Sequence, residues 1–199
     1  MVTETASKRP VILALFLIVF GIIGWIAAFA LTVEKFALLT DPKAVLGCDL
    51  SPLVQCSTNL LSDQGALFGF PNPILGLSGW IAPIVVGAAI LSGARFNRVF
   101  WLLFNLGVAA AMALVVFLII TSIFFLGTLC PWCMVTWVVT IPTFLAVTFR
   151  NVKVGNFGSG ARLKRIGSTL YGWVPAITLI LFIVIAVMAQ VRLDVINRL

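Results

Sequence analysis

Four cysteines are the residues whose types and spacing indicate chemistry in this chain. Cys130 and Cys133 form a C-x-x-C motif inside the longest uncharged run, and Cys48 and Cys56 lie eight residues apart. Thiolates attack disulfides, and the thiol pKa of such a motif falls when the motif begins a helix. The motif therefore indicates thiol–disulfide exchange, although a local structural disulfide or two inert buried thiols would have the same pattern.

The residues around the C-x-x-C motif predict where its sulfur atoms lie. With Cys130 at the N-cap, Pro131 takes the first helical position and Cys133 falls in the first turn. Free backbone N–H groups and the helix dipole favour negative charge there. No charged residue lies between Val99 and Phe149, so the dipole would take the place of a basic side chain.

The loop pair has the features of an exchanging disulfide. A bridge between Cys48 and Cys56 closes a short ring, which stabilises a fold less than a bridge across a long loop. Ser51 and Pro52 predict the N-cap and first residue of a short helix that carries Cys56. The apolar side chains that we expect on the membrane surface are Leu53, Val54, Leu60 and Leu61. An ordinary structural loop disulfide is the alternative.

Other common chemistries lack a matching set of residues. An all-cysteine zinc site usually has two closely spaced pairs, whereas one pair here is wider, so we expect no metal. The chain contains no His, which excludes His-ligated haem, Ser-His-Asp hydrolysis and a His general base.

Membrane-spanning helices must position these cysteines. The 199-residue chain is 62 % hydrophobic and only 10 % charged, which indicates a multi-spanning, all-α integral membrane protein. Uncharged runs predict spans over residues 10–33, 73–92 and 168–190. The run over 99–149, roughly 77 Å as one helix, exceeds a ~30 Å hydrocarbon core and must turn back near Gly127, which gives five spans. The first run is longer than the apolar core of a signal peptide, so we expect it to remain as a span.

Basic residues predict the orientation of the spans. Those expected inside are Lys8, Arg9, Arg95, Arg98, Arg150, Lys153, Arg162, Lys164 and Arg165, against Lys35, Lys43, Arg192 and Arg198 outside. This distribution places the N-terminus inside, and the loop over about 34–72 and all four cysteines on the outer face, in an oxidising compartment. No basic patch with interleaved aromatic residues appears, so we expect no nucleic-acid partner.

The chain resembles the bacterial branch of the vitamin K epoxide reductase family. The resemblance covers the first four spans and is carried by Gly47-Cys48, Cys56, the segment FGFPNPILGLSGW at 68–80, and Cys130-Pro131-Trp132-Cys133. It implies a four-helix bundle around a quinone, menaquinone or ubiquinone, over residues 1–150. A cytoplasmic linker (151–167) and a fifth transmembrane helix with a short outer tail (168–199) follow.

The resemblance also implies a role for each site residue. Cys48 would meet a reduced partner, Cys56 would exchange with Cys130, and Cys133 would face the quinone. Asn72, between two prolines at the start of the second span, would donate a hydrogen bond to a quinone carbonyl. An amide at that depth is expensive unless paired, so it is a candidate ligand from the sequence as well, with a helix cap as the alternative.

Trp137 is a departure from the vertebrate pattern. It lies one turn after Cys133 on the same helix face, where vertebrate members carry Tyr. Its indole would donate to or stack on a quinone, or anchor the helix at the membrane boundary. The substitution puts epoxide reduction in doubt. The sequence also stops shortly after the fifth span, so we expect no fused thioredoxin-like domain of the kind that some bacterial relatives carry.

The predicted function is that of a quinone-linked thiol oxidoreductase that generates disulfides. Electrons would pass from a separate, DsbA-like thioredoxin-fold protein outside a bacterial cytoplasmic membrane to Cys48-Cys56, then to Cys130-Cys133, then to the membrane quinone pool. Three alternatives stay open. They are an enzyme that reduces a quinone or vitamin K epoxide for the quinone's sake, a membrane disulfide isomerase or reductase fed from inside, and a non-enzymatic scaffold with two structural disulfides.

Overall fold

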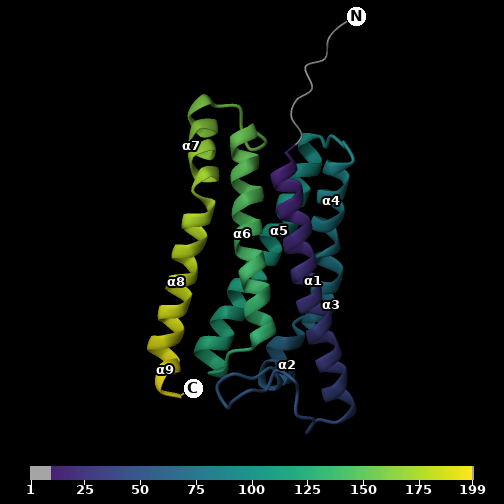
Figure 1. Ribbon diagram of the computed structural model, residues 1–199, viewed down its shortest axis with the longest axis vertical. Coiled ribbons are helices and arrows are strands. Elements are labelled where there is room, and N and C mark those ends of the chain that lie inside the picture. The colour runs from purple at the N-terminus through teal and green to yellow at the C-terminus, as the bar shows by residue number, and fades with distance from the viewer. Residues whose placement is uncertain (1–9, 199) are drawn as a thin grey trace, which may run out of the picture.

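The computed structural model describes residues 10–198. It contains five long helices (Figure 1). Each is long and apolar enough to cross a membrane. They are α1 (Val11–Thr40), α3 with α4 (Asn72–Gly79 and Ile81–Leu91), α5 with its π-helical end η2 (Arg98–Ile120 and Thr121–Leu126), α6 (Pro131–Val154) and α8 (Val174–Leu193). The expected all-α membrane fold with five spans is confirmed.

The shorter elements lie between and after the spans. They are α2 (Ser57–Leu61), the 3-10 turn η1 (Asp63–Ala66), α7 (Ala161–Gly172) and α9 (Val195–Arg198). Within residues 10–198 there is no strand, although Val54 and Leu129 form an isolated parallel bridge. Lys8 and Arg9, which contributed to the expected orientation, lie outside the described residues.

The first four spans pack together as a bundle. Helix α1 packs along α3, α4 and α6, and α5 packs along α6. Helix α8 lies beside this bundle, where it contacts α6 and η2 (Figure 1). The first two spans approach closely, since a Cβ at Gly24 would clash with the ring of Trp80. The Trp80 ring therefore rests directly on the α1 backbone.

The turn between the third and fourth spans places the C-x-x-C motif. The end of α5 widens into the π-helix η2, and Gly127 then adopts a left-handed conformation with φ of 69°. Glycine takes this conformation without steric cost, so the chain reverses there. The Ser122 hydroxyl donates a short hydrogen bond to the Thr128 carbonyl across the turn. The expected turn near Gly127 is confirmed.

The first helix continues past the end that the sequence suggested. The uncharged run stops at Val33, but α1 includes Glu34 and Lys35 and ends only at Thr40. A proline disfavours the helical conformation of the residue before it, and Asp41 precedes Pro42. An uncharged run thus measures the crossing of the membrane rather than the length of the helix.

The segment expected to be a linker over 151–167 is also largely helical. Helix α6 extends to Val154, α7 covers Ala161–Gly172, and the fifth span begins at Val174 rather than near Ser168. Helix α7 carries Arg162, Lys164 and Arg165, so a search for uncharged runs passes over it.

The two ends of the bundle differ chemically. One end, here called the cysteine end, consists of the 41–71 loop with α2 and of the turn before α6 (Figure 1). The other, here called the arginine end, consists of the 92–97 turn, the end of α6 and helix α7.

Candidate active site

The fourth span begins at the C-x-x-C motif as the sequence predicted. Cys130 is the N-cap of α6, Pro131 is the first helical residue, and the backbone N–H of Cys133 donates to Cys130 Sγ at 3.4 Å. The hydrogen bond from the Cys133 side chain, opposed by burial and aided by the N–H groups of Cys133 and Trp132, holds the pKa of the Cys130 thiol below its ordinary value. The local geometry thus favours a thiolate at Cys130.

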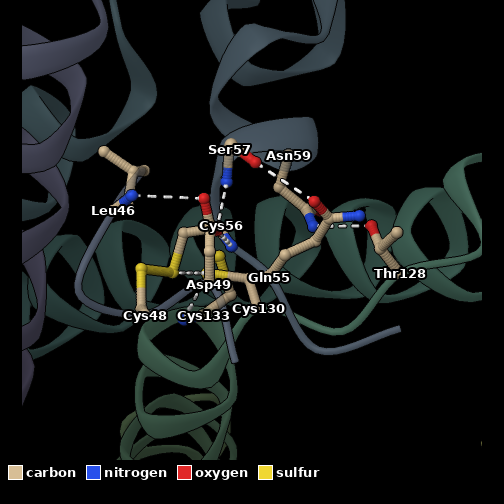
Figure 2. Close-up of a disulfide and its surroundings, with 10 residues drawn as sticks. All are labelled: Leu46, Cys48, Asp49, Gln55, Cys56, Ser57, Asn59, Thr128, Cys130 and Cys133. Atoms are coloured by element: carbon tan, nitrogen blue, oxygen red, sulfur yellow. Dashed lines mark hydrogen bonds between the residues drawn. A yellow bond between two sulfur atoms is a disulfide. The ribbon is translucent and has the colours of Figure 1, made fainter. Parts of the chain in front are cut away.

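The loop cysteines form a disulfide at the same end of the bundle (Figure 2). The Cα atoms of Cys48 and Cys56 are 5.8 Å apart. Cys56 is fully buried and Cys48 is 5 % exposed, so both sulfur atoms are largely shielded from solvent.

The two pairs meet through one pair of sulfur atoms. Cys56 Sγ lies 3.3 Å from Cys130 Sγ, although 74 residues separate them in the sequence (Figure 2). Cys130 is fully buried and Cys133 is half-buried. Thiol–disulfide exchange needs the attacking sulfur to reach the disulfide directly, and Cys56 and Cys130 are positioned for it.

A short backbone bridge holds the loop against the turn before α6. The N–H of Leu129 donates to the Leu53 carbonyl at 2.8 Å, and the N–H of Gln55 donates to the Leu129 carbonyl at 3.0 Å. This pairing fixes the residues immediately before Cys56 and Cys130, so it sets the register in which the two sulfur atoms approach each other.

Helix α2, which follows Cys56, is held at both ends by side chains from other elements. One oxygen of Asp49 accepts from the N–H groups of Cys56 and Ser57, at 2.7 and 3.1 Å (Figure 2). Lys35 of α1 donates from Nζ to the Leu60 carbonyl at 2.7 Å. An anion at the start of a helix and a cation at its end both stabilise the helix dipole.

These hydrogen bonds favour the ionised form of the Asp49 carboxyl group. Partial burial acts to raise the pKa of its carboxyl, but the hydrogen bonds from the N–H groups of Ser57, Cys56 and Leu46 outweigh burial and hold the pKa below its ordinary value. The carboxylate form is therefore the one that anchors the loop.

A side-chain hydrogen bond joins α2 to the same turn. Asn59 Nδ2 donates to Thr128 Oγ1 at 3.0 Å across 69 residues of sequence (Figure 2). Together with the backbone bridge, it ties the loop to the turn on both sides of Cys56.

The short helix of the loop starts later than the sequence suggested. Ser51 and Pro52 form a turn, in which Ser51 Oγ accepts from the Val54 N–H, and the helix begins at Ser57 with Cys56 at its N-cap. The expected placement of all four apolar side chains on the membrane surface is wrong, because Leu53 and Leu60 are buried in the protein. Leu61 is 52 % exposed. Hydrogen bonds that Asp49 accepts from the N–H groups of Cys56 and Ser57 replace the predicted Ser-Pro start.

A cavity of about 620 Å³ lies inside the bundle next to the fourth span. Its volume falls within the range of small-molecule sites, about 300–1,000 Å³. Residues of α1, α3, α4, α5 and α6 line it, mostly with apolar side chains. Polar groups at its wall include Cys133, Asn72, Asn59, Thr136 and Thr140. The cavity therefore borders one of the two free thiols.

Asn72 lines this cavity and is the first residue of α3. Its Oδ1 accepts from the Leu67 N–H at 3.1 Å, and its Nδ2 donates to the Gln64 carbonyl at 2.7 Å. The side chain thus ties down the preceding turn and does not cap its own helix. Nδ2 carries two N–H groups, and Gln64 takes one of them.

Trp137 also lines the cavity, one helical turn after Cys133. It is 5 % exposed and packs in the main apolar cluster with Ile141 of α6 and Val115 of α5. The indole lies inside the bundle rather than at the outer surface of the span.

The sequence did not predict a role at the site for Asp49, Asn59, Thr128 and Lys35. Asp49 directly follows Cys48, but a single Asp in a loop has no distinctive pattern. Asn59 and Thr128 contact each other only because the fold joins distant segments. No local sequence signal identifies such a pair.

Comparison with protein families agrees with the family resemblance found in the sequence. The model of the Vitamin K epoxide reductase family matches residues 15–148, which contain all four cysteines and most of the first four spans. The chain belongs to this family. No match was found among curated proteins or among solved structures. Membership of the vitamin K epoxide reductase family makes the chain a multi-pass membrane oxidoreductase with quinone-linked redox activity.

The cavity is suited to the quinone that this family uses. Apolar walls match a hydrophobic ring and its side chain, Asn72 offers a hydrogen-bond donor, and Cys133 places sulfur at the wall. Within residues 10–198, no group of three His, Cys, Asp or Glu side chains has the geometry of a metal site.

Proposed function

We propose that this protein is a thiol:quinone oxidoreductase that generates disulfides in a partner protein. The observation that carries the proposal is the 3.3 Å approach of Cys56 Sγ to Cys130 Sγ, with Cys133 at the wall of the apolar cavity. This arrangement supports a path for electrons from the loop to the interior of the membrane domain.

The first exchange takes place between a reduced partner and the loop pair. A partner thiolate attacks Cys48 Sγ, and a mixed disulfide forms as Cys56 leaves as a thiolate. The second partner thiol then attacks the partner's own sulfur in that mixed disulfide and releases Cys48. The partner gains a disulfide, and Cys48 and Cys56 become a dithiol.

The second exchange is internal. The Cys56 thiolate attacks Cys130 of an oxidised Cys130–Cys133 pair, and Cys133 leaves as a thiolate. Cys48 then attacks Cys56, re-forms the loop disulfide and releases Cys130 as a thiolate. In the structure Cys48 and Cys56 are bonded to each other, and Cys130 and Cys133 are free.

The dithiol at the start of α6 is finally reoxidised by quinone. Two electrons and two protons leave Cys130 and Cys133 as their disulfide forms, and they convert the quinone substrate to quinol. In this proposal Cys133 faces the quinone ring, Asn72 donates to a ring carbonyl, and Trp137 stacks beside it. Menaquinone and ubiquinone both have the required chemistry.

The partner in this proposal is a DsbA-like, thioredoxin-fold dithiol protein on the outer side of a bacterial cytoplasmic membrane. Such proteins present the C-x-x-C dithiol that the first exchange requires. The loop disulfide at the cysteine end and the basic residues at the opposite end support this orientation, because basic residues favour the cytoplasmic side.

Paired cysteine substitutions test the internal exchange directly. The double variant Cys48→Ser/Cys133→Ser retains only Cys56 and Cys130, and on oxidation we expect these two to form a disulfide in nearly every molecule. The matched control Cys56→Ser/Cys130→Ser retains Cys48 and Cys133, which we expect to stay reduced. Mass spectrometry of peptides from non-reduced protein distinguishes the two outcomes, and a missing Cys56–Cys130 bond contradicts the relay.

The complete function is tested with purified protein, a reduced thioredoxin-fold dithiol protein and a soluble quinone. We expect quinol formation and partner oxidation at equal rates, followed by ultraviolet absorbance and by thiol labelling. A scaffold with structural disulfides would give neither reaction. Quinol formation with a small added dithiol as the reductant, but not with the thioredoxin-fold protein, would instead favour an enzyme that acts for the quinone's sake.

The orientation is tested by labelling single introduced cysteines in a background without the native four. A membrane-impermeant maleimide on intact cells should label Lys43→Cys, at the cysteine end. It should label Asn97→Cys and Lys153→Cys only after the membrane is opened. Labelling of position 153 on intact cells would contradict an outer active site.

A further inference from the structure

A second, smaller cavity lies at the arginine end of the bundle, away from the cysteines. It has a volume of about 170 Å³ and is bordered by Pro10 at the start of α1, by Arg95 and Phe96 of the 92–97 turn, by Trp101 of α5 and by Arg150 of α6. We call it the arginine pocket. The proposed redox function uses none of these residues.

Arg150 is held in this pocket by its neighbours. Its guanidinium lies 3.5 Å from the centre of the Trp101 ring, and its Nη1 donates to Asn151 Oδ1 at 3.2 Å. Asn151 is itself fully buried and donates to the Trp101 carbonyl at 3.0 Å and to Asn105 Oδ1 at 2.9 Å. The side chain that supports Arg150 is therefore fixed by α5.

The fixed guanidinium has more hydrogen-bonding capacity than the protein uses. A guanidinium carries five N–H donors, and among residues 10–198 Asn151 Oδ1 is the acceptor that Arg150 reaches. A half-buried cation is costly unless an anion or further acceptors compensate it. Arg150 lines the arginine pocket, so a further acceptor for its remaining N–H groups would lie inside that pocket.

Described acidic residues cannot supply that acceptor. Every acidic side chain among residues 10–198 belongs to the cysteine end or to the helix ends that lead to it, namely Glu34, Asp41, Asp49, Asp63 and Asp194. Among residues 10–198, the charged side chains at the arginine end are all cations, namely Arg95, Arg98, Arg150, Lys153, Arg162, Lys164 and Arg165. An anion from the surroundings is therefore the complementary ligand.

The position of the pocket identifies the kind of anion. It lies where the spans α1, α4, α5 and α6 end, the level at which lipid headgroups meet the protein. Helix α1 begins there at Pro10 without a side-chain cap, so its first N–H groups add a positive dipole end. Basic pockets between transmembrane helices bind anionic headgroups, and guanidinium groups bind phosphate in a bidentate manner.

We propose that the arginine pocket binds the phosphate group of an anionic phospholipid, with Arg150 as the principal ligand and Arg95 as the second. The lipid joins the turn between α4 and α5 to the end of α6, on the side of the membrane opposite the cysteines. Free inorganic phosphate has the same chemistry, so the experiment separates the two sources.

The test compares lipid binding by the full-length protein and its variants. Each is placed in nanodiscs of phosphatidylcholine alone or of phosphatidylcholine with phosphatidylglycerol, and retained lipid is counted by native mass spectrometry. We expect wild type to retain phosphatidylglycerol selectively and to unfold at a higher temperature when it is present. In Arg150→Gln the affinity for phosphatidylglycerol should fall about tenfold or more, as expected for the loss of a charge-assisted hydrogen bond.

Two further variants make the result specific to the pocket. Arg95→Gln changes an exposed side chain, so this variant should fold normally. It should lose part of the selective retention of phosphatidylglycerol. If Arg150→Gln does not fold, the result for Arg95→Gln tests the proposal. Arg162→Gln changes another exposed arginine at the same end, outside the pocket, and should retain phosphatidylglycerol as wild type does. Equal retention by wild type, Arg150→Gln and Arg95→Gln would overturn the proposal.

Inorganic phosphate is tested separately in neutral nanodiscs. Sodium phosphate is compared with sodium chloride at equal ionic strength, and the thermal midpoint is measured. Stabilisation by phosphatidylglycerol alone means that the phosphate binds as part of a lipid. Stabilisation by phosphate as well, lost in Arg150→Gln, means that the pocket accepts the free ion too. No stabilisation of wild type by either would exclude an anion site.

Discussion

The two cysteine pairs are positioned by different means. Cys130 and Cys133 are set by the helix that they begin, through an N-cap sulfur, a proline at the first helical position and one local hydrogen bond. Cys48 and Cys56 lie in a loop that distant segments hold in place. These contacts come from α1 and from the turn before α6.

This difference indicates which pair can move. Hydrogen bonds, each typically worth ~0.5–1.5 kcal/mol, and the apolar side chains of Leu53 and Leu60 hold the loop to distant segments. These contacts can break together without unfolding a span. The C-x-x-C pair cannot leave its place unless the first turn of α6 unwinds. We therefore expect the loop pair to shuttle between the partner and Cys130, while the helix pair stays beside the cavity.

Substitution of Cys48 should have the largest effect, because it should stop the reaction of the loop pair and leave the reaction of the C-x-x-C pair with quinone. In Cys48→Ser we expect oxidation of a thioredoxin-fold protein to stop, because the loop disulfide cannot form. A small membrane-permeant dithiol should still drive quinone reduction, because it reaches Cys133 through the cavity. Quinone absorbance with each reductant measures both reactions, and an equal loss with the two reductants would show that Cys48 acts within the quinone site.

Substitution of Asn72 tests the reaction of the C-x-x-C pair with quinone. A ring carbonyl that loses its buried donor costs ~1–3 kcal/mol, so Asn72→Ala should raise the quinone KM or lower kcat by roughly 5- to 100-fold. Exchange between the loop pair and the partner should continue. Steady-state quinone kinetics give the first quantity and thiol labelling gives the second. Unchanged quinone kinetics would leave Asn72 with only its contacts to Gln64 and Leu67.

Asn59 tests the attachment of the loop. Loss of its hydrogen bond to Thr128 in Asn59→Ala should slow internal exchange about two- to tenfold, the range that corresponds to one neutral hydrogen bond. Stopped-flow measurement of loop-disulfide formation gives this rate. Thr58→Ala, at the neighbouring position, is the matched control and should exchange at the wild-type rate. If Asn59→Ala and Thr128→Ala slow exchange additively in the double variant, the two side chains do not act as a pair.

Asp49 should produce the smallest effect, visible in its pH dependence. Its folded-state pKa is lowered, so its contribution to stability is fully present above the ordinary pKa, about 3.9, and is lost as the pH falls through the lowered value. The thermal midpoint of wild type should therefore exceed that of Asp49→Asn near neutral pH. The difference should shrink below about pH 4. A constant difference across that range would exclude the carboxylate as the anchor.

The sequence predicted the features that depend on neighbouring residues. The N-cap position of Cys130, the reversal at Gly127 and the five spans each follow from local residue types, and the structure agrees with all three. The ends of α1 and α8 were less predictable, because charged residues continue a helix beyond the hydrocarbon core.

The features that the sequence could not predict depend on tertiary contacts. The start of α2 at Ser57 is one of them, since Asp49 caps it from outside the helix. Burial of Leu53 and Leu60 is another, because their amphipathic pattern suits a membrane surface as well as a protein interior. The approach of Cys56 to Cys130 came from the family resemblance, and no spacing rule would have supplied it.

Burial of the loop disulfide also determines which thiols in the surroundings can react with it. With Cys56 fully buried and Cys48 5 % exposed, a water-soluble thiol must wait for the loop to open before it meets a sulfur atom. At high thiol concentration the reaction rate then approaches the opening rate and stops increasing. A docked protein can promote that opening through its own contacts, whereas a small metabolite cannot. The membrane quinone pool is thereby protected from wasteful reduction by whatever low-molecular-weight thiols the compartment contains.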